Sequence, residues 1–214
     1  MRRIGLVALS ALLYASAFPP LACTPLAWVA LVPLLVAIAP ASPRRAALLG
    51  LVWGVLMALG VGWPLAGMLG RYFGTPPWIG WLAWLAVAVF AAGVHYAAFA
   101  AWVAWLVRRG RGAPLAIAAG WALTELVRGR YAPQNPWALI AYSQTEWPRI
   151  VQIADLAGPY GIGFVVVAAN AALAGLVCRR LAGRHPGWST AGVAALVALT
   201  LGYGEWRLDT ADGA

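Results

Sequence analysis

The sequence contains no lysine, and acidic residues are almost as scarce. Its 15 basic residues are all arginines, set against six aspartates and glutamates, and charged residues make up only 10% of the 214 residues. A soluble domain carries roughly 25% charged residues. Because so few charges cannot cover a surface that faces water, this scarcity excludes an ordinary soluble domain. It indicates instead a chain whose surface faces mostly lipid.

Cysteine and histidine are equally sparse. The two cysteines, Cys23 and Cys178, lie in or beside apolar runs and fit no metal-ligand or redox spacing. Ser143 has no histidine near it in the sequence, and the chain has neither a glycine-rich phosphate loop nor a cluster of metal ligands. The residues therefore indicate no catalytic centre, no metal and no cofactor.

Apolar runs fill most of the chain, since 63% of its residues are hydrophobic. At roughly 20 residues per crossing, this length allows about six to eight transmembrane helices. Prolines, glycines and arginine clusters divide the apolar runs, and polar stretches occupy 67–77 and 131–149. The predicted helices span about 4–19, 25–39, 46–66, 78–107, 114–130, 150–178 and 189–206. The sequence thus predicts an all-α protein, a polytopic transmembrane helix bundle of about seven helices.

Charge sorts the connecting loops into two sides. If the N-terminus is cytoplasmic, ten arginines and no acid fall on the inner side, as the positive-inside rule requires. These ten are Arg2, Arg3, Arg44, Arg45, Arg108, Arg109, Arg111, Arg179, Arg180 and Arg184. The other arginines and all six acids lie outside or at helix ends near the outer side. This predicts seven crossings with the C-terminus outside. It also argues against nucleic acid as a partner, which would need a polar basic face.

Two ionisable residues within a predicted helix are the main candidates for a functional site. Charged groups inside a membrane are costly, and Glu125 and Arg128 lie three residues apart on one helix face, where they can neutralise each other. Two interpretations stay open. The pair is either an internal ion pair that lets helix 114–130 pack, or part of a polar pocket that meets a lipid headgroup. Asp155 is either a helix-end acid or a further member of such a site.

The stretch 131–149 is the most polar part of the chain near the membrane. Asn135-Pro136-Trp137 and Tyr142-Ser143-Gln144 place amide, hydroxyl and aromatic groups at headgroup level, although such dipeptides are also common in turns. Asn170 is expected to make an interhelical hydrogen bond. Tryptophans near helix ends predict interfacial anchors. They include Trp28, Trp63, Trp78, Trp81, Trp137, Trp147 and Trp206.

Several motifs together resemble the membrane-spanning N-terminal part of bacterial apolipoprotein N-acyltransferase. The most specific block begins with Trp121-Ala122-Leu123-Thr124-Glu125-Leu126-Val127-Arg128-Gly129 and continues through the two loop motifs named above. The shorter matches are Phe18-Pro19-Pro20, Pro25-Leu26-Ala27-Trp28, Pro33-Leu34-Leu35, Gly62-Trp63 and Ile153-Ala154-Asp155-Leu156-Ala157-Gly158-Pro159-Tyr160-Gly161. The resemblance covers roughly residues 15–175.

This resemblance implies a multi-pass protein of the bacterial inner membrane. The family transfers an acyl chain from a membrane phospholipid to the diacylglyceryl cysteine of a lipoprotein, at the periplasmic face. It implies seven helices, then a nitrilase-like domain with a Glu-Lys-Cys triad and a thioester intermediate, then an eighth helix. The present sequence has no lysine, and neither its cysteines nor Glu125 match that triad. No catalytic residue can therefore be carried over.

Three hypotheses follow. The favoured one is the membrane domain of a split or truncated N-acyltransferase, which binds phospholipid and diacylglyceryl lipoprotein while a separate nitrilase-like chain supplies catalysis. The alternatives are a non-catalytic membrane scaffold for another enzyme, and a small transporter with a helix broken at 158–161. The favoured hypothesis places a transmembrane domain over 1–207 and a short periplasmic tail over 208–214. Its substrate-binding residues are Glu125, Arg128, Asn135, Trp137, Tyr142, Ser143, Gln144 and Asp155.

Overall fold

The computed structural model describes residues 2–181 and 188–212, and within these ranges the chain is mostly helical and contains no β-strand. The α-helices are α1 (Arg2–Ser16), α2 (Val32–Ile38), α3 (Pro43–Val61), α4 (Trp63–Tyr72), α5 (Pro77–Val87), α6 (Val94–Arg108), α7 (Pro114–Arg130), α8 (Pro148–Val151), α9 (Ala154–Leu181) and α10 (Trp188–Asp212). Two 3-10 segments, η1 (Thr24–Trp28) and η3 (Ile140–Gln144), and a π-helical turn, η2 (Ala88–Gly93), complete the described elements. The all-α prediction is confirmed.

Each predicted helix has a helical counterpart, although several are divided. The predicted helix 114–130 coincides with α7. The predicted helix 46–66 is interrupted at Gly62, where the backbone leaves the helical region because its φ is −109° and its ψ is 21°. Helix α4 then continues to Tyr72, so the turn predicted over 67–77 is confined to the residues between α4 and α5. The weak point predicted at 158–161 falls at Gly158, whose φ of 61° and ψ of −163° are not helical.

Three helical stretches of the described chain are long and apolar enough to cross a bilayer. They are Pro43–Val61, Pro77–Arg108 and Ala154–Arg180. The second is continuous because η2 joins α5 directly to α6. Helix α10 runs to Asp212, so residues 208–212, predicted as a tail, continue the helix. These stretches agree with a membrane protein, whereas the full count of seven crossings stays a prediction.

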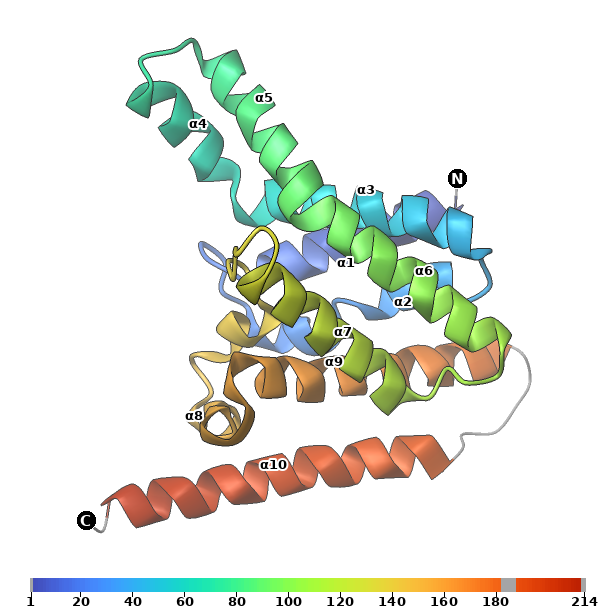
Figure 1. Cartoon of the computed structure of the whole chain (residues 1–214). Helices are drawn as coiled ribbons and strands as arrows, with labels where there is room; N and C mark the ends of the chain where they lie inside the picture. Colours follow the sequence, from blue (N-terminus) through green and yellow to red (C-terminus); the bar gives the residue numbers. More distant parts are fainter. Residues whose placement is uncertain (1, 182–187, 213–214) are drawn as a thin grey trace.

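The helices alternate in direction, so the arginine clusters come together at one end of the bundle. The start of α1, the start of α3, the end of α6 and the end of α9 all lie at the right of Figure 1. We call this the arginine end. The opposite end, which carries residues 131–147, is called the loop end. The alternation thus agrees with the predicted sorting of the arginines, except that Arg184 lies outside the described residues. The side of the membrane that each end faces stays a prediction.

A cluster of buried aromatic rings forms the centre of the bundle. Trp53 packs edge-on against Tyr14, Tyr96 and Trp121, with ring centroids 5.3, 4.9 and 5.7 Å apart. Trp53 Nε1 donates a hydrogen bond to Ser10 Oγ at 2.9 Å. Because edge-to-face aromatic packing contributes beyond the area it buries, these rings fix α1, α3, α6 and α7 against one another directly beneath the loop end.

Asn170 makes the predicted interhelical hydrogen bonds. Its amide Nδ2 donates to the carbonyl of Ala27 at 2.9 Å, and its Oδ1 accepts from the N–H of Leu31 at 2.8 Å. The backbone between η1 and α2 is irregular at this point, and its free polar groups would be costly among apolar helices. Asn170 of α9 therefore stabilises the break that divides the predicted helix 25–39.

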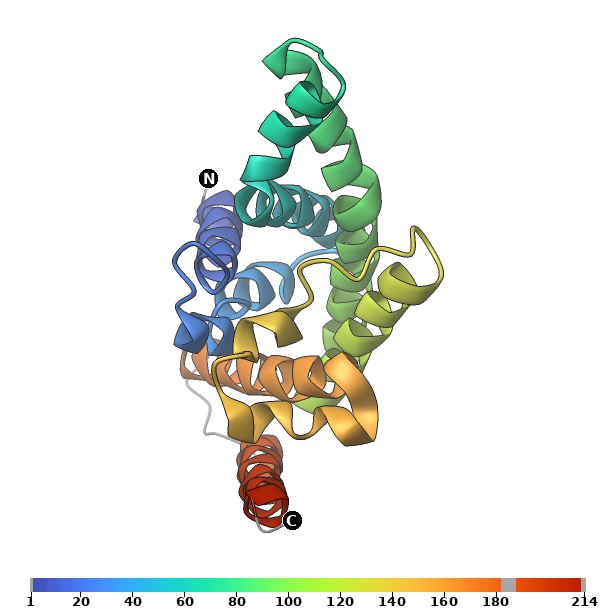
Figure 2. The same ribbon diagram turned by 90° about the vertical axis from the view of Figure 1, so that its left-hand side faces the viewer.

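The hairpin of α4 and α5 extends away from the rest of the bundle in both views (Figures 1 and 2). The two helices approach closely at Gly80, where a Cβ would lie 2.2 Å from the carbonyl oxygen of Ala66. The hairpin exposes Trp63, Trp78 and Trp81. These exposed rings suit the predicted interfacial anchoring, which stays a prediction. Trp28, by contrast, is half-buried and takes part in the site described next.

Candidate functional site

Glu125 and Arg128 lie in the last turns of α7 and are both buried, with 0% and 2% of their surfaces exposed. The ion pair predicted between them is not formed: among the described residues, Arg149 with Glu205 and Arg207 with Asp155 are the ion pairs. The helical spacing does place both side chains on one face. Each side chain instead forms hydrogen bonds with backbone groups of residues 135–140, which would otherwise lack partners inside the bundle.

Glu125 holds the start of η3. Its Oε1 accepts the backbone N–H of Ile140 at 3.0 Å. Its Oε2 lies beside Gly163 of α9, where a Cβ would be only 3.0 Å from that oxygen. A larger residue at Gly163 would therefore press on the carboxylate. The close packing of α7 on α9 thus depends on a glycine opposite Glu125.

Arg128 holds the turn that precedes η3. Its Nη1 donates to the carbonyl oxygens of Asn135 at 3.2 Å and Trp137 at 2.8 Å. The N–H of Asn135 donates back to the carbonyl of Arg128 at 2.8 Å, and Asn135 Oδ1 accepts the N–H of Trp137 at 3.0 Å. The Asn-Pro-Trp motif is therefore a tight turn that is fastened to the end of α7 by charged and neutral hydrogen bonds.

Ser143 and Gln144 form a buried chain of hydrogen bonds. Ser143 Oγ donates to the carbonyl of Ile140 at 2.6 Å and accepts from Gln144 Nε2 at 2.8 Å. Gln144 Oε1 accepts from Trp28 Nε1 at 2.9 Å. This chain joins η3 to η1, which is more than a hundred residues earlier in the sequence. Both side chains point into the protein rather than toward the surface.

Tyr142 points the opposite way from the two residues that follow it. It is 44% exposed on the loop end, whereas Ser143 and Gln144 are buried. Partial burial raises the pKa of its phenol above the ordinary value, and the nearby Tyr160 adds to this effect. The hydroxyl therefore stays neutral, and able to donate a hydrogen bond, throughout the physiological pH range.

Asp155 belongs to a separate exposed network. Its carboxylate accepts from Tyr203 Oη at 2.9 Å and from Arg207 Nε at 2.9 Å, so it ties the start of α9 to α10. Its polar partners are thus on α10 and not on the 131–147 loop. Of the eight predicted residues, the structure brings seven together around this loop and places Asp155 in a different set of contacts.

Access to Arg128 is narrow. A cavity of about 10 Å³ lies between Arg128, Asn135, Trp137 and Trp84. This volume is comparable to what a single water molecule requires, and is far too small for a lipid headgroup. A headgroup at the loop end would meet Tyr142 and the outer parts of Asn135 and Trp137, while Arg128 and Glu125 would stay behind them.

Sequence reasoning missed two aromatic residues that also hold the loop. Tyr14 of α1 donates its hydroxyl to the carbonyl of Ala138 at 2.9 Å. Trp28, whose interfacial anchoring stays a prediction, also donates to Gln144 as described above. Both lie in apolar runs whose pattern gives no sign of a partner in a distant loop. The one available signal was that Tyr14 places a phenol hydroxyl within a predicted membrane helix, where a hydroxyl group needs a hydrogen-bond partner.

The fold and the site define an all-helical membrane protein in which α7 and neighbouring helices hold one ordered, polar loop at the end of the bundle. Comparison with known proteins agrees with this class. Residues 10–172 match the family model of the apolipoprotein N-acyltransferase N-terminal domain. The chain therefore belongs to this family.

Individual relatives carry the same family name. The chain is 35% identical over 213 residues to an apolipoprotein N-acyltransferase of Geobacter metallireducens, an alignment that covers 96% of this chain and 40% of that protein. A second relative, from Rhodopirellula baltica, is 29% identical over 165 residues, which cover 72% of this chain and 28% of that protein. The chain thus spans less than half of the length of these relatives, and the family model that it matches is that of an N-terminal domain.

Proposed function

We propose that this chain is the membrane domain of an apolipoprotein N-acyltransferase. It binds a membrane phospholipid as acyl donor and a diacylglyceryl lipoprotein as acyl acceptor, in the bacterial inner membrane, with the loop end facing the periplasm. The observation that carries the proposal is the anchoring of residues 135–140 by Glu125 and Arg128, in a chain that belongs to this family.

Catalysis is assigned to a nitrilase-like unit outside these 214 residues, either on the same polypeptide or on a separate chain. The resemblance implies a Glu-Lys-Cys triad, and the sequence given has no lysine. The membrane domain contributes binding and orientation, because holding two reactants in a fixed geometry lowers the barrier even without a reacting group.

Within the site we assign two kinds of role. Tyr142, Asn135 and Trp137 contact the substrates, since they lie at or near the surface of the loop end. Glu125 and Arg128 are positioning residues, because they are buried and act through the loop backbone. Ser143 and Gln144 support the loop from inside. Asp155 holds α10 against α9, so its effect on substrate is through α10.

The substrate side of the proposal rests on the chemistry of the exposed groups. The Tyr142 hydroxyl is a neutral donor, and Arg130 at the end of α7 is exposed without an acidic partner in the described chain. A phospholipid offers phosphate and ester oxygens at the same depth of the membrane. Amide, hydroxyl and guanidinium groups are suitable donors to such oxygens.

A chimera tests the proposal directly. This chain would replace the aligned region of the Geobacter metallireducens relative, and the product would be assayed for N-acylation of a diacylated lipopeptide in phospholipid vesicles. Acylation above that of the relative's remaining domain alone is expected. A chimera that folds and inserts but shows no acylation would contradict the proposal and favour a non-catalytic scaffold.

Variants of the chimera separate the two roles. Tyr142→Ala is expected to raise the KM for phospholipid several-fold, whereas Thr145→Ala, an exposed change on the same loop, leaves it unchanged. Glu125→Ala is expected to lower kcat through the displaced loop, and Glu125→Gln, which keeps an acceptor for Ile140, restores most of it. Equal kinetics for both Glu125 variants would leave the residue only a role in stability.

A further inference from the structure

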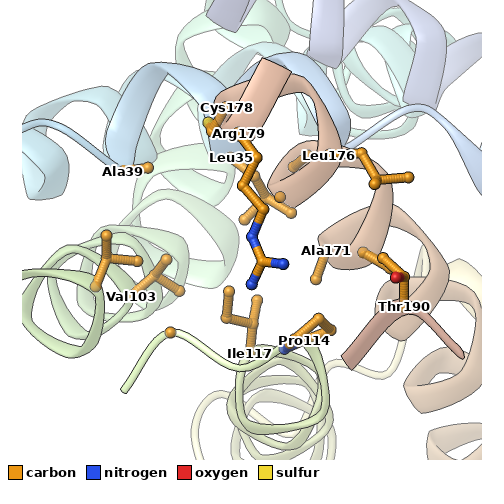
Figure 3. A pocket seen from close by; sticks show the side chains of 15 residues that line it. Leu35, Ala39, Val103, Pro114, Ile117, Ala171, Leu176, Cys178, Arg179 and Thr190 are labelled. Atoms are coloured by element: carbon orange, nitrogen blue, oxygen red, sulfur yellow. The ribbon is translucent and has the colours of Figure 1, made fainter. Parts of the chain in front are cut away.

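A second concave region lies at the arginine end, far from the loop end. It is an apolar cavity of about 180 Å³ between α2, α6, α7 and α9. Its walls include Leu35, Val103, Ile117 and Ala171, and the edge of α10 contributes to its rim (Figure 3). This volume exceeds the roughly 150 Å³ of an engineered apolar cavity that holds benzene. The region therefore has room for a segment of an acyl chain.

One charged side chain enters this apolar cavity. Arg179, in the last turn of α9, is half-buried and points its guanidinium into the space between the helices (Figure 3). No carboxylate in the described part of the chain pairs with it. Arg180, its neighbour in sequence, is exposed and does not line the cavity. The positive charge of Arg179 is therefore free to form charge-assisted hydrogen bonds with an anionic ligand.

A second, wider cavity of about 480 Å³ adjoins the first and adds two more cations. It is lined by Arg2 and Arg3 of α1, and the two cavities share Ala39, Val107 and Cys178. Neither lining contains an aspartate or glutamate. The two cavities therefore adjoin along Ala39, Val107 and Cys178, and each combines apolar walls with at least one arginine.

We propose that these two adjoining cavities bind one anionic phospholipid. Its phosphate lies at the guanidinium of Arg179, an acyl chain runs along the apolar walls of the same cavity, and Arg2 and Arg3 add positive charge in the adjoining cavity. The charge at the arginine end favours an anionic headgroup over a zwitterionic one, because basic pockets between membrane helices attract anionic lipids. The apolar walls suit an acyl chain rather than a phosphate alone, because aliphatic side chains such as Leu35, Val103 and Ile117 offer no hydrogen-bond donor to a polar ligand.

This site is distinct from the loop end and does not depend on acyl transfer. Arg2 and Arg179 lie at the ends of α1 and α9 that are opposite to the loop residues (Figure 1). The lipid bound here would join α1, α2, α6 and α9 at that end, and would thus stabilise the bundle.

The test uses the 214-residue chain purified in an uncharged detergent. Dioleoylphosphatidylglycerol and dioleoylphosphatidylcholine are added separately, because they share acyl chains and differ in headgroup charge. Retained lipid is measured by native mass spectrometry, and thermal stability by the unfolding midpoint. The anionic lipid is expected to be retained and to raise the midpoint more than the zwitterionic one. Equal retention and equal stabilisation by the two lipids would overturn the proposal.

Two pairs of variants locate the site. Arg179→Gln is expected to weaken binding of phosphatidylglycerol about fivefold, and the matched change Arg180→Gln to leave it unchanged. Gly175→Leu fills the apolar cavity, where a Cβ meets no atom within 4 Å, and is expected to reduce retention of the anionic lipid. Gly192→Leu, on α10 and also unobstructed, is its control. Equal losses in Arg179→Gln and Arg180→Gln, or full retention by a folded Gly175→Leu protein, would show that no such site exists.

Discussion

Glu125 Oε1 accepts the backbone N–H of Ile140 at 3.0 Å, rather than pairing with the guanidinium of Arg128 on the same face of α7. Arg128 supplies a donor where Glu125 supplies an acceptor, since its Nη1 donates to the carbonyl of Trp137 at 2.8 Å. An acid thus satisfies a donor and a base satisfies an acceptor in one irregular loop. Without these two side chains, the N–H of Ile140 and the carbonyl of Trp137 would lose these partners, and a buried polar group without a partner costs several kcal/mol by order of magnitude.

Removing the acceptor at Glu125 is expected to destabilise the protein. Glu125→Ala leaves the N–H of Ile140 unsatisfied, and the loss should be about 1.5–3 kcal/mol in the free energy of unfolding. Glu125→Gln should lose less, because its amide oxygen still accepts. Chemical unfolding in detergent measures the difference. The control is Leu123→Ala at an exposed position of the same helix, and a larger loss in the control would contradict the assigned role of Glu125.

Shortening the reach of Arg128 is expected to loosen the turn at 135–137. Arg128→Lys keeps the charge but offers one ammonium in place of the planar guanidinium, whose Nη1 serves two carbonyls. Limited proteolysis should then cut between α7 and η3 several-fold faster than in the unchanged protein. Arg130→Lys, at an exposed position two residues further along the helix, is the matched control. Equal cleavage rates in the two variants would contradict the proposal that the hydrogen bonds of Arg128 hold this turn.

Asn170 is expected to be the most sensitive polar residue of α9. Asn170→Leu removes both the donor to Ala27 and the acceptor for Leu31. Interhelical hydrogen bonds in membranes contribute about 0.6–2 kcal/mol, so a loss of this size or somewhat more is expected in the free energy of unfolding. Thr124→Val removes only a hydrogen bond within its own helix and serves as the comparison. A neutral Asn170→Leu protein would show that the break between η1 and α2 is satisfied by other means.

The docking of α10 on α8 should depend on Gly204. A Cβ at this position would lie 1.9 Å from the carbonyl oxygen of Arg149, whereas a Cβ at Gly202 meets nothing within 4 Å. Because backbone cannot move aside as a flexible side chain can, Gly204→Ala should destabilise the packed helix by about 1–3 kcal/mol. Gly202→Ala should be neutral or slightly stabilising. Thermal unfolding of the two variants in the same detergent compares them, and equal midpoints would contradict the close contact.

The network of Arg149, Glu205, Asp155 and Arg207 offers a separate measurement on α10. Both ion pairs are exposed to a large extent, so each should contribute little to the free energy of unfolding, and less at high salt. Asp155→Asn is therefore expected to change the unfolding midpoint only slightly at low salt and not at all in 1 M salt. The amide oxygen of Asn still accepts from Tyr203, so a large loss that salt does not reduce would mean that Asp155 has a partner beyond Tyr203 and Arg207.

The class of the protein and the order of its helices follow from local features of the amino-acid sequence. Scarce charge and long apolar runs exclude a soluble domain, and helix 114–130 coincides with α7 because its ends carry a proline and arginines. The sorting of the arginines by loop also agrees with the fold, since hydropathy, helix breaks and charge are local properties. For the same reason the break at Gly158 was visible in advance.

Which polar groups contact one another depends on the packing of the helices and could not be predicted from the sequence. The sequence suggested a local pair of Glu125 and Arg128, but their partners are backbone groups of a loop, which no side-chain pattern reveals. The partners of Gln144 and Ala138 are Trp28 and Tyr14, more than a hundred residues earlier. The sequence predicts Arg179 to be a loop arginine like the others. The packing of α2, α6, α7 and α9 instead forms an apolar cavity that its guanidinium lines. The physical reason is common to all three: a buried polar group is satisfied by whatever the fold brings near it, and that depends on distant segments.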